Sequence, residues 1–353
     1  MEAGLRMSGA KTLMLLLLIS LSSCNGRENN LEVLRFRNGK FRIVQFTDVH
    51  FQYNSEKSDS ALVLIKKVIE RENPDLVMLT GDIVCSKNTG EAWLEIGKVL
   101  AEAGVPWGVT LGNHDREFEL TNRQIMETIR PLTNCVIVDD PCGVAGNGNY
   151  ILEIKAEKSD KTEALIYCFD SHSSFTSEED LGTYEWIDFS QIAWYRDRSS
   201  QFTTSNGGEP FPSLAFFHIP LPEYKEIAGL EDTYGICKES VCSPDLNSGF
   251  FTAMLECGDV MGMFVGHDHN NNFIGCLRKI CLAYGNISGR QAYGEIGRGA
   301  RVIDLYEGER HFDTYVLKMY ECDRDKDIWE AAQDRTPQYF VTFSDSVLLA
   351  PAL

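Results

Sequence analysis

The chain has 353 residues, of which 43% are hydrophobic and 24% charged, as in an ordinary globular protein with a sizeable core. Its 52 Asp and Glu residues outnumber its 33 Lys and Arg residues, which gives a net charge of −19. No run rich in Lys or Arg occurs, so we expect no non-specific binding of nucleic acid. An acidic protein can still bind a phosphate substrate if bound cations dominate the field of the site.

The N-terminus has the pattern of an export signal. A basic start precedes the apolar stretch Leu13–Ile19, which is too short to span a membrane. The Leu-Ser-Ser-Cys sequence at 21–24 is similar to a bacterial lipobox, whose Cys becomes the acylated first residue. We expect residues 1–23 to be a lipoprotein signal peptide and 24–37 a tether, with lipid on Cys24 anchoring the protein to a membrane in the periplasm or at the cell surface. The alternative is a secreted protein with an incidental cysteine.

The first half of the chain alternates short apolar runs with amphipathic segments. The periodicity predicts strands at 41–47, 76–80 and 105–110 and helices at 60–70 and 91–103. Thr121 and Gln124 form a capping-box pattern at the start of a third helix. This alternation predicts a sheet with crossover helices, and therefore an α/β fold.

The second half is richer in strands. We expect a helix near 190–198 and strands at 135–138, 150–154, 164–169, 214–217, 261–265, 280–284, 300–305 and 312–318. Between His218 and Gly249 the chain has little periodicity, and long insertions of this kind often form part of a binding wall. Residues 321–353 are predicted to be an irregular C-terminal extension with no assigned role.

Five of the apolar runs are followed directly by residues that bind metals or transfer protons. These segments are Asp48-Val49-His50, Gly81-Asp82, Gly112-Asn113-His114-Asp115, His218 and Gly266-His267-Asp268-His269. Ligands of α/β sheets collect beyond the carboxyl ends of the strands, so we expect the five segments to meet in one crevice. The glycines allow the tight turns and close backbone approach that such a site requires.

The residue types indicate a site for two metal ions. Seven side chains are candidate ligands: Asp48, His50, Asp82, Asn113, His218, His267 and His269. One ion needs only three or four protein ligands, so seven indicate two ions that share a carboxylate. Imidazole nitrogen with carboxylate and amide oxygen suits divalent Mn, Fe or Zn. Two such ions, roughly 3.5–4 Å apart, form a clamp for displacement at phosphorus. Gly-Asp or a lone His means little by itself, and the specificity comes from all five motifs in order.

In this order the motifs resemble the calcineurin-like metallophosphoesterase superfamily, over roughly residues 41–305. The sequence Phe-Phe-His-Ile-Pro-Leu-Pro-Glu-Tyr at 216–224 further resembles a branch related to purple acid phosphatases. The resemblance implies a four-layer αββα sandwich, with two mixed sheets flanked by helices and the metal site at the C-terminal ends of the strands. The corresponding domain would cover residues 38–320.

The resemblance also implies a role for each candidate. One metal would be held by Asp48, His50, Asp82 and His269, and the other by Asp82, Asn113, His218 and His267. His114 matches the general acid of the family, and Asp115 would orient it. The implied function is hydrolysis of small phosphate esters by metal-activated water. A phosphodiesterase or nucleotidase of the same fold is an alternative, and so is a metal-containing binding lipoprotein without catalysis.

Two positions depart from the purple acid phosphatases. Those enzymes carry a Tyr that ligates ferric iron three residues after the bridging Asp, and this chain has Cys85 there. They also have Gly where this chain has His50. The departures favour the divalent ion pair of the wider superfamily over an Fe(III)–tyrosinate centre.

The chain has 11 cysteines, and ten remain if Cys24 is acylated. Export would permit disulfides, and short spacing makes three local pairs candidates: Cys135/Cys142, Cys237/Cys242 and Cys276/Cys281. Spacing alone does not establish connectivity. Cys85 and Cys168 lie in or beside predicted strands, where we expect them to behave as small buried hydrophobic residues.

Overall fold

The computed structural model describes residues 33–175, 181–323, 328–331, 339–343 and 347–351, with side chains through Met319. The predicted signal peptide at 1–23 and the predicted lipid site Cys24 lie outside these residues. Within the described part of the chain, no helix is long and apolar enough to cross a membrane.

The described strands form two mixed sheets. The first has the order β14-β13-β11-β10-β1-β2-β3, with β12 paired to β11, and the second has the order β4-β5-β6-β7-β9-β8. The strands of the first sheet are β1 (Lys40–Phe46), β2 (Leu76–Thr80), β3 (Trp107–Thr110), β10 (Gly299–Tyr306), β11 (His311–Asp323), β12 (Ile328–Ala331), β13 (Tyr339–Phe343) and β14 (Val347–Pro351). Those of the second are β4 (Tyr150–Lys155), β5 (Thr162–Cys168), β6 (Ser213–Phe216), β7 (Val260–Val265), β8 (Ile274–Leu277) and β9 (Ile280–Tyr284). Strands β1, β2 and β3 run parallel, as do β6 and β7, so their C-terminal ends lie at one edge of each sheet.

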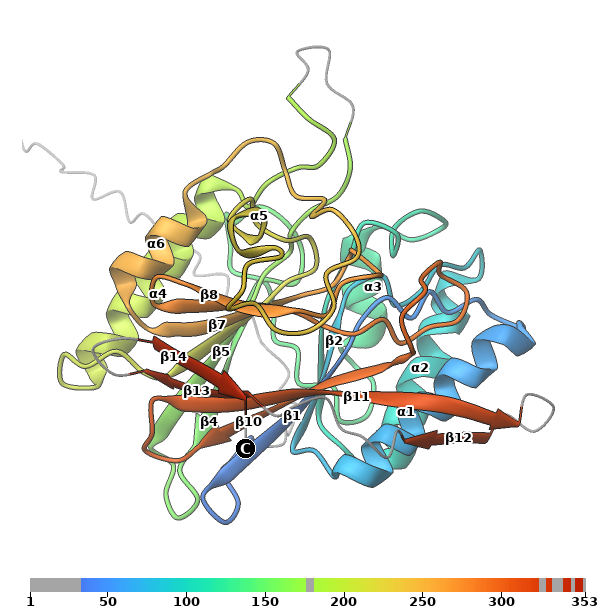
Figure 1. Ribbon diagram of the computed structural model, residues 1–353, viewed down its shortest axis with the longest axis horizontal. Coiled ribbons are helices and arrows are strands. Elements are labelled where there is room, and N and C mark those ends of the chain that lie inside the picture. The colour runs from blue at the N-terminus through green and yellow to red at the C-terminus, as the bar shows by residue number, and fades with distance from the viewer. Residues whose placement is uncertain (1–32, 176–180, 324–327, 332–338, 344–346, 352–353) are drawn as a thin grey trace, which may run out of the picture. The chain divides into compact units, whose positions relative to one another are not determined.

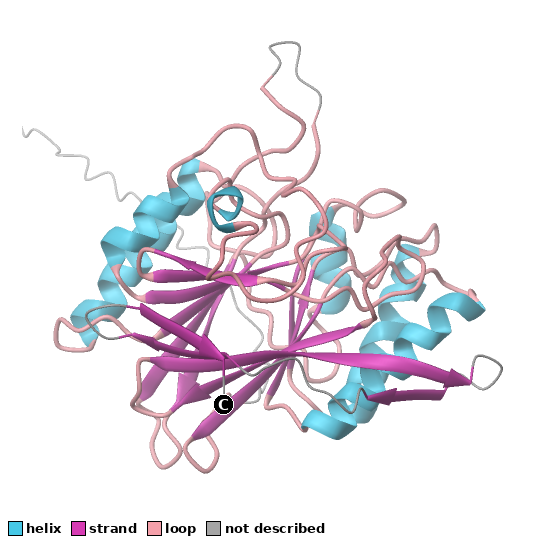
Figure 2. Cartoon of the chain, viewed as in Figure 1, coloured by secondary structure: helices cyan, strands magenta, loops and turns pink. Residues whose placement is uncertain are grey.

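Helices flank the sheets on both sides (Figures 1 and 2). They are α1 (Glu56–Glu72), α2 (Thr89–Ala103), α3 (Asn122–Ile129), α4 (Phe189–Ser205), α5 (Tyr224–Ile227) and α6 (Phe250–Cys257). Helices α1 and α2 lie beside the first sheet, and α4 and α6 beside the second (Figure 1). The predicted capping box of Thr121 and Gln124 is present at the start of α3. The predicted fold class, two mixed sheets with flanking helices, is confirmed.

Strands β6, β7 and β9 of the second sheet are buried on both faces. Phe216 and Phe264 belong to the core shared with the first sheet, and the ring of Phe264 lies 5.7 Å from that of Phe312 on β11. The next residues along the strands point the other way, where Met263 on β7 joins a second core with Phe250 of α6. Burial on both faces explains why these strands read as continuous apolar runs without alternation.

Two predicted segments differ from the structure. Residues 135–138 form no strand, because Cys135 makes only an isolated bridge to Trp107 at the edge of β3. Residues 321–353 were expected to be irregular, and this was wrong for the described part: β11 continues to Asp323, β12 and β13 pair with it, and β14 pairs with β13. These strands depend on pairing with distant residues, which local periodicity does not encode.

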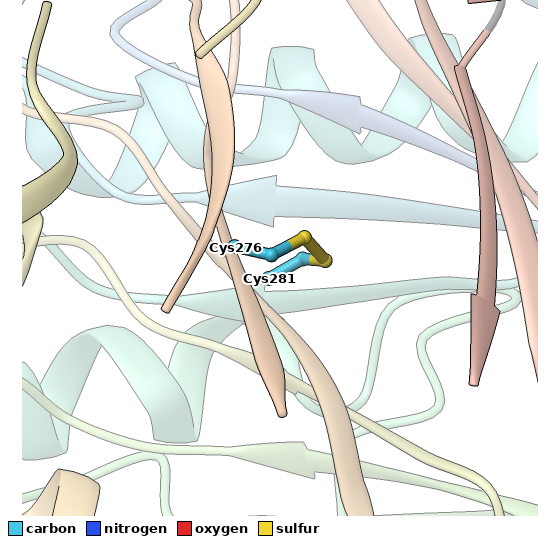
Figure 3. The surroundings of a disulfide bond; sticks show 2 residues. All are labelled: Cys276 and Cys281. Carbon is cyan, nitrogen blue, oxygen red and sulfur yellow. A yellow bond between two sulfur atoms is a disulfide. The ribbon is translucent and has the colours of Figure 1, made fainter. Parts of the chain in front are cut away.

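Only one of the three candidate disulfides is formed. Cys276 on β8 and Cys281 on β9 lie opposite each other in the antiparallel register and are bonded (Figure 3). The other four candidates have free thiols: Cys135, Cys142, Cys237 and Cys242. Cys168 is buried as expected, whereas Cys85 is only partly buried.

Candidate metal centre

The five predicted segments converge beyond the strand ends. Those after β1, β2 and β3 come from the first sheet, and those after β6 and β7 come from the second. Every one of the seven candidate ligands is at most 8% exposed. Donor atoms of Asp48, His50, Asp82 and His269 all lie within 4.8 Å of one another, and so do those of Asp82, His218 and His267. The sets share Asp82, as the resemblance implies.

Asp82 lies at the centre of the cluster. Its Oδ1 accepts the backbone N–H of His114 at 2.8 Å, which fixes the carboxylate. Its Oδ2 faces three imidazoles, at 3.1 Å from Nε2 of His218, 3.7 Å from Nε2 of His50 and 4.0 Å from Nε2 of His114. One oxygen is therefore anchored to the backbone, and the other is directed at the nitrogen atoms.

Two of the imidazoles are oriented from behind by backbone carbonyls. Nδ1 of His218 lies 2.8 Å from the carbonyl oxygen of Thr80, and Nδ1 of His269 lies 3.1 Å from that of Tyr293. With Nδ1–H donated to a carbonyl, Nε2 of each ring is turned toward a carboxylate, that of Asp82 for His218 and that of Asp48 for His269. Metal-binding histidines usually have such a partner, because it fixes both tautomer and ring orientation.

The backbone around the cluster adopts conformations that are rare outside glycine. Asp48, His50, Asp82 and His267 have φ values from 47° to 81°. Such residues cost about 1–3 kcal/mol each and concentrate at functional sites, where surrounding contacts hold them. The two sheets supply one of these contacts, since the backbone N–H of His267 donates to the carboxylate of Asp48 at 3.2 Å.

The predicted close approach at the glycines is confirmed. A Cβ atom at Gly81 would lie 2.4 Å from Cγ of His218, and one at Gly112 would lie 2.2 Å from Oδ1 of Asp82. Any larger residue at these positions would displace a candidate ligand.

The electrostatics favour a bound cation. Burial opposes ionisation of Asp82, but His218 outweighs it and lowers the pKa of Asp82 well below its usual range. Burial likewise opposes protonation of His218, and Asp82 outweighs it and raises the pKa of His218 to about 10. Burial and the nearby His218 lower the pKa of His267 to about 3, and burial also lowers that of His50. The cluster therefore combines ionised carboxylates with the neutral imidazoles of His50 and His267, whose lone pairs are available.

Four donor atoms of this cluster are buried without a hydrogen-bond partner among the described residues. They are Nε2 of His50, Oδ2 of Asp82, Oδ1 of Asn113 and Nε2 of His218. A buried polar atom without a partner costs about 1–3 kcal/mol, so such atoms require compensation. Two cations that share Asp82 would satisfy all four atoms. The residues present therefore fit a dinuclear metal site.

The expectation that Asp115 orients His114 was wrong. The Asp115 carboxylate accepts four backbone N–H groups at 2.8–2.9 Å, from Asp82, Ile83, Val84 and Gly112. These bonds use both oxygens and fasten the loop after β2 to the loop after β3. Asp115 thus supports the position of Asp82, while His114 has a different partner.

That partner is Glu117, which the sequence analysis missed. Oε1 of Glu117 lies 2.6 Å from Nδ1 of His114, whose side chain is 38% exposed. The backbone N–H of Glu117 also donates to the carbonyl of His114 at 3.2 Å, which closes a turn. An acidic residue three positions after His114 was the available signal.

The long segment between His218 and Gly249 forms a wall beside the cluster. The backbone N–H groups of Lys238 and Glu239 donate to Oδ1 of Asn271 at 3.1 Å, close to the ligand segment after β7. Glu239 also accepts a hydrogen bond from the hydroxyl of Tyr293, whose ring lies 4.1 Å from that of His269. The wall therefore reaches a candidate metal ligand through one aromatic side chain.

Comparison with known proteins also indicates a phosphoesterase. The sequence model of the calcineurin-like phosphoesterase family matches residues 41–271. Probable inactive purple acid phosphatase 29 of Arabidopsis thaliana is 35% identical over 76% of this chain and 78% of its own length. Phosphatase DCR2 of Saccharomyces cerevisiae is 32% identical over 76% of this chain and 51% of its own. A dimetal phosphatase from Danio rerio shares the fold, with a TM-score of 0.55 at 13% identity over 86% of this chain and 99% of that one.

Proposed function

This chain belongs to the calcineurin-like phosphoesterase family, and we propose that it hydrolyses small phosphate esters with the aid of two divalent metal ions, Mn, Fe or Zn. The observation that carries this proposal is the packing of donor atoms from six buried side chains into two sets that share Asp82. Two ions in such a site would activate water and offset the negative charge that develops on the phosphoryl oxygens.

Each residue around the ions would have its own role. Asp82 belongs to both donor sets and is held by the backbone N–H of His114, so it would bridge the ions. Asp48, His50 and His269 would complete one site, and Asn113, His218 and His267 the other. His114 is partly exposed, with a side chain that is 38% accessible, and its Nε2 would give a proton to the leaving oxygen. General acid catalysis of this kind typically contributes 10²–10⁴-fold.

The names of the relatives support a second candidate function. Three relatives from Arabidopsis thaliana are named probable inactive purple acid phosphatases, whereas the yeast relative is named a phosphatase. A metal-containing binding protein without catalysis would share the fold and the ligands. Hydrolysis is favoured here because the chain retains all seven candidate ligands together with His114.

The discriminating experiment measures turnover by the purified protein loaded in turn with Mn, Fe and Zn. We expect metal-dependent release of p-nitrophenol from p-nitrophenyl phosphate. Faster turnover of bis-p-nitrophenyl phosphate would indicate the diesterase alternative. Two bound ions per chain with no turnover of either substrate would instead support the binding protein.

We also propose that the protein is exported and anchored through lipid on Cys24. The basic start, the short apolar stretch and the Leu-Ser-Ser-Cys sequence support this proposal. The disulfide between Cys276 and Cys281 independently supports export, though not the lipid anchor, because disulfides persist mainly in oxidising compartments. A phosphate ester outside the cytoplasm would then be the substrate.

A further inference from the structure

Three side chains form a hydrogen-bonded series beside the metal cluster. Oε1 of Glu117 lies 2.6 Å from Nδ1 of His114. The other carboxylate oxygen, Oε2, accepts from the thiol of Cys85 at 3.6 Å. Burial, followed by the neighbouring Glu117, raises the pKa of Cys85 to about 12, so the thiol keeps its proton and acts as a donor. Glu117 is thus held from one side and contacts the imidazole on the other.

The two ring nitrogens of His114 face different surroundings. Nδ1 contacts Glu117, while Nε2 lies 4.0 Å from Oδ2 of Asp82 and faces the metal cluster. Asp115 cannot take the place of Glu117, because both of its oxygens are occupied by backbone N–H groups. We propose that Glu117, supported by Cys85, is the positioning residue for the general acid His114. This inference rests on the proposed phosphoesterase function.

The same three residues could be considered a third metal site, since their donor atoms lie within 4.8 Å of one another. The contact between His114 and Glu117 argues against that reading. Bonds of about 2.0–2.1 Å to a tetrahedral ion place two ligand atoms about 3.3 Å apart. The observed 2.6 Å is too short for two ligands of one ion and suits a charge-assisted hydrogen bond.

The hydrogen bond would serve one step of the reaction. As water oxygen bonds to phosphorus, the ester P–O bond breaks and its electron pair passes to the leaving oxygen. That oxygen takes the proton from Nε2 of His114, and a proton from the attacking water restores the imidazolium. Glu117 keeps Nδ1 protonated and the ring turned so that Nε2 carries the transferred proton. The net products are an alcohol and inorganic phosphate.

The kinetic test compares Glu117→Ala and Glu117→Gln with the matched control Glu119→Ala, a nearby exposed residue of the same loop. For an alkyl phosphate, whose leaving group needs a proton, we expect kcat of Glu117→Ala to fall about 10- to 100-fold. For p-nitrophenyl phosphate the fall should be at most about threefold, with KM and bound metal unchanged. Glu117→Gln keeps an acceptor for Nδ1–H and should recover part of the loss. Equal losses on both substrates would overturn the proposal. So would a loss of bound metal in Glu117→Ala, whether from the two ions of the cluster or from a third ion held by Glu117.

A spectroscopic test does not depend on activity. The chain has seven histidines, so ring ¹⁵N–¹H spectra of the zinc-loaded protein are simple enough to assign His114 by its loss in His114→Ala. At a pH where the ring is neutral we expect the Nδ1–H tautomer in the wild-type protein and in Glu119→Ala. Glu117→Ala should shift the ring toward the Nε2–H tautomer. An unchanged tautomer would overturn the proposal, whereas an inactive wild-type protein with the expected spectra would overturn only the proposed function.

Discussion

Nε2 of His218 lies 3.1 Å from Oδ2 of Asp82, although the two residues follow strands of different sheets. The contact spans the junction at which the carboxyl ends of β2 and β6 meet. His218 is fully buried and is also tied to the first sheet through the carbonyl of Thr80. The geometry of the metal centre therefore depends on how the two sheets pack against each other.

Asp82→Asn should lower metal content at both sites. An amide oxygen is a weaker ligand than a carboxylate, and Asp82 is the residue shared by the two donor sets. Elemental analysis should find fewer than one ion per chain. The matched control His269→Ala removes a ligand of one set and should leave about one ion. Two ions still bound to Asp82→Asn would rule out the bridging role.

His114→Ala should keep both metals and lose activity selectively. The loss should reach about 10²–10⁴-fold for an alkyl phosphate and be small for p-nitrophenyl phosphate, whose leaving group needs no proton. Steady-state rates on both substrates, with metal analysis on the same sample, provide the measurement. An equal loss on both substrates would point to electrostatic stabilisation of the transition state, and loss of metal would make His114 a ligand or structural support.

Asp115→Asn should destabilise the loops that carry the metal ligands. The amide group would point at least one N–H at backbone donors that now meet a carboxylate oxygen. We expect a loss of about 2–3 kcal/mol in the free energy of unfolding, measured with urea, and weaker metal binding. Asp160→Asn, at a side chain that is 92% exposed, is the control and should unfold like the wild type. Wild-type stability in Asp115→Asn would contradict the structural role.

Asp304 should contribute stability that depends on pH. Its buried carboxylate accepts hydrogen bonds from Nε and Nη2 of Arg42 at 2.7 and 2.8 Å. Burial raises the pKa of Asp304, but the bonds from Arg42 outweigh burial and lower it below its ordinary value. A carboxyl group with a lowered pKa stabilises the fold above its unfolded pKa, about 3.9, and this contribution is lost as the pH falls.

Asp304→Asn should therefore cost about 3 kcal/mol at pH 7 and less at pH 3, as measured by urea unfolding at both values. The control is Glu102→Gln, which removes the exposed partner of Lys66 and should have little effect at either pH. A cost in Asp304→Asn that does not change with pH would show that the ion pair is not its source.

Acylation at Cys24 predicts a specific mature chain. Intact-mass analysis of the membrane fraction should find a protein that begins at Cys24 and carries lipid mass, and Cys24→Ala should abolish that species. Several acyl chains on one residue would anchor the protein firmly, where a single chain would not. A water-soluble product beginning at another residue would support the secretory alternative.

The sequence alone was sufficient to predict the α/β fold and to select the side chains that the structure brings together around Asp82. This worked because each candidate follows an apolar run directly, and parallel strands deliver their C-terminal residues to one edge. The close backbone approach at Gly81 and Gly112 was predictable for the same reason. The apolar run and the residues directly after it are enough to identify each candidate ligand.

The tertiary structure decided which side chains bond to each other and which strands pair. Asp115 bonds to amides some thirty residues earlier in the chain, so its neighbour His114 is left to Glu117. Residues 339–343 and 347–351 are strands because β13 pairs with β11 and β14 pairs with β13. The register of β8 against β9 places Cys276 opposite Cys281, which allows the disulfide. These outcomes depend on distances between segments remote in sequence, and periodicity carries only the direction of each side chain relative to its own strand.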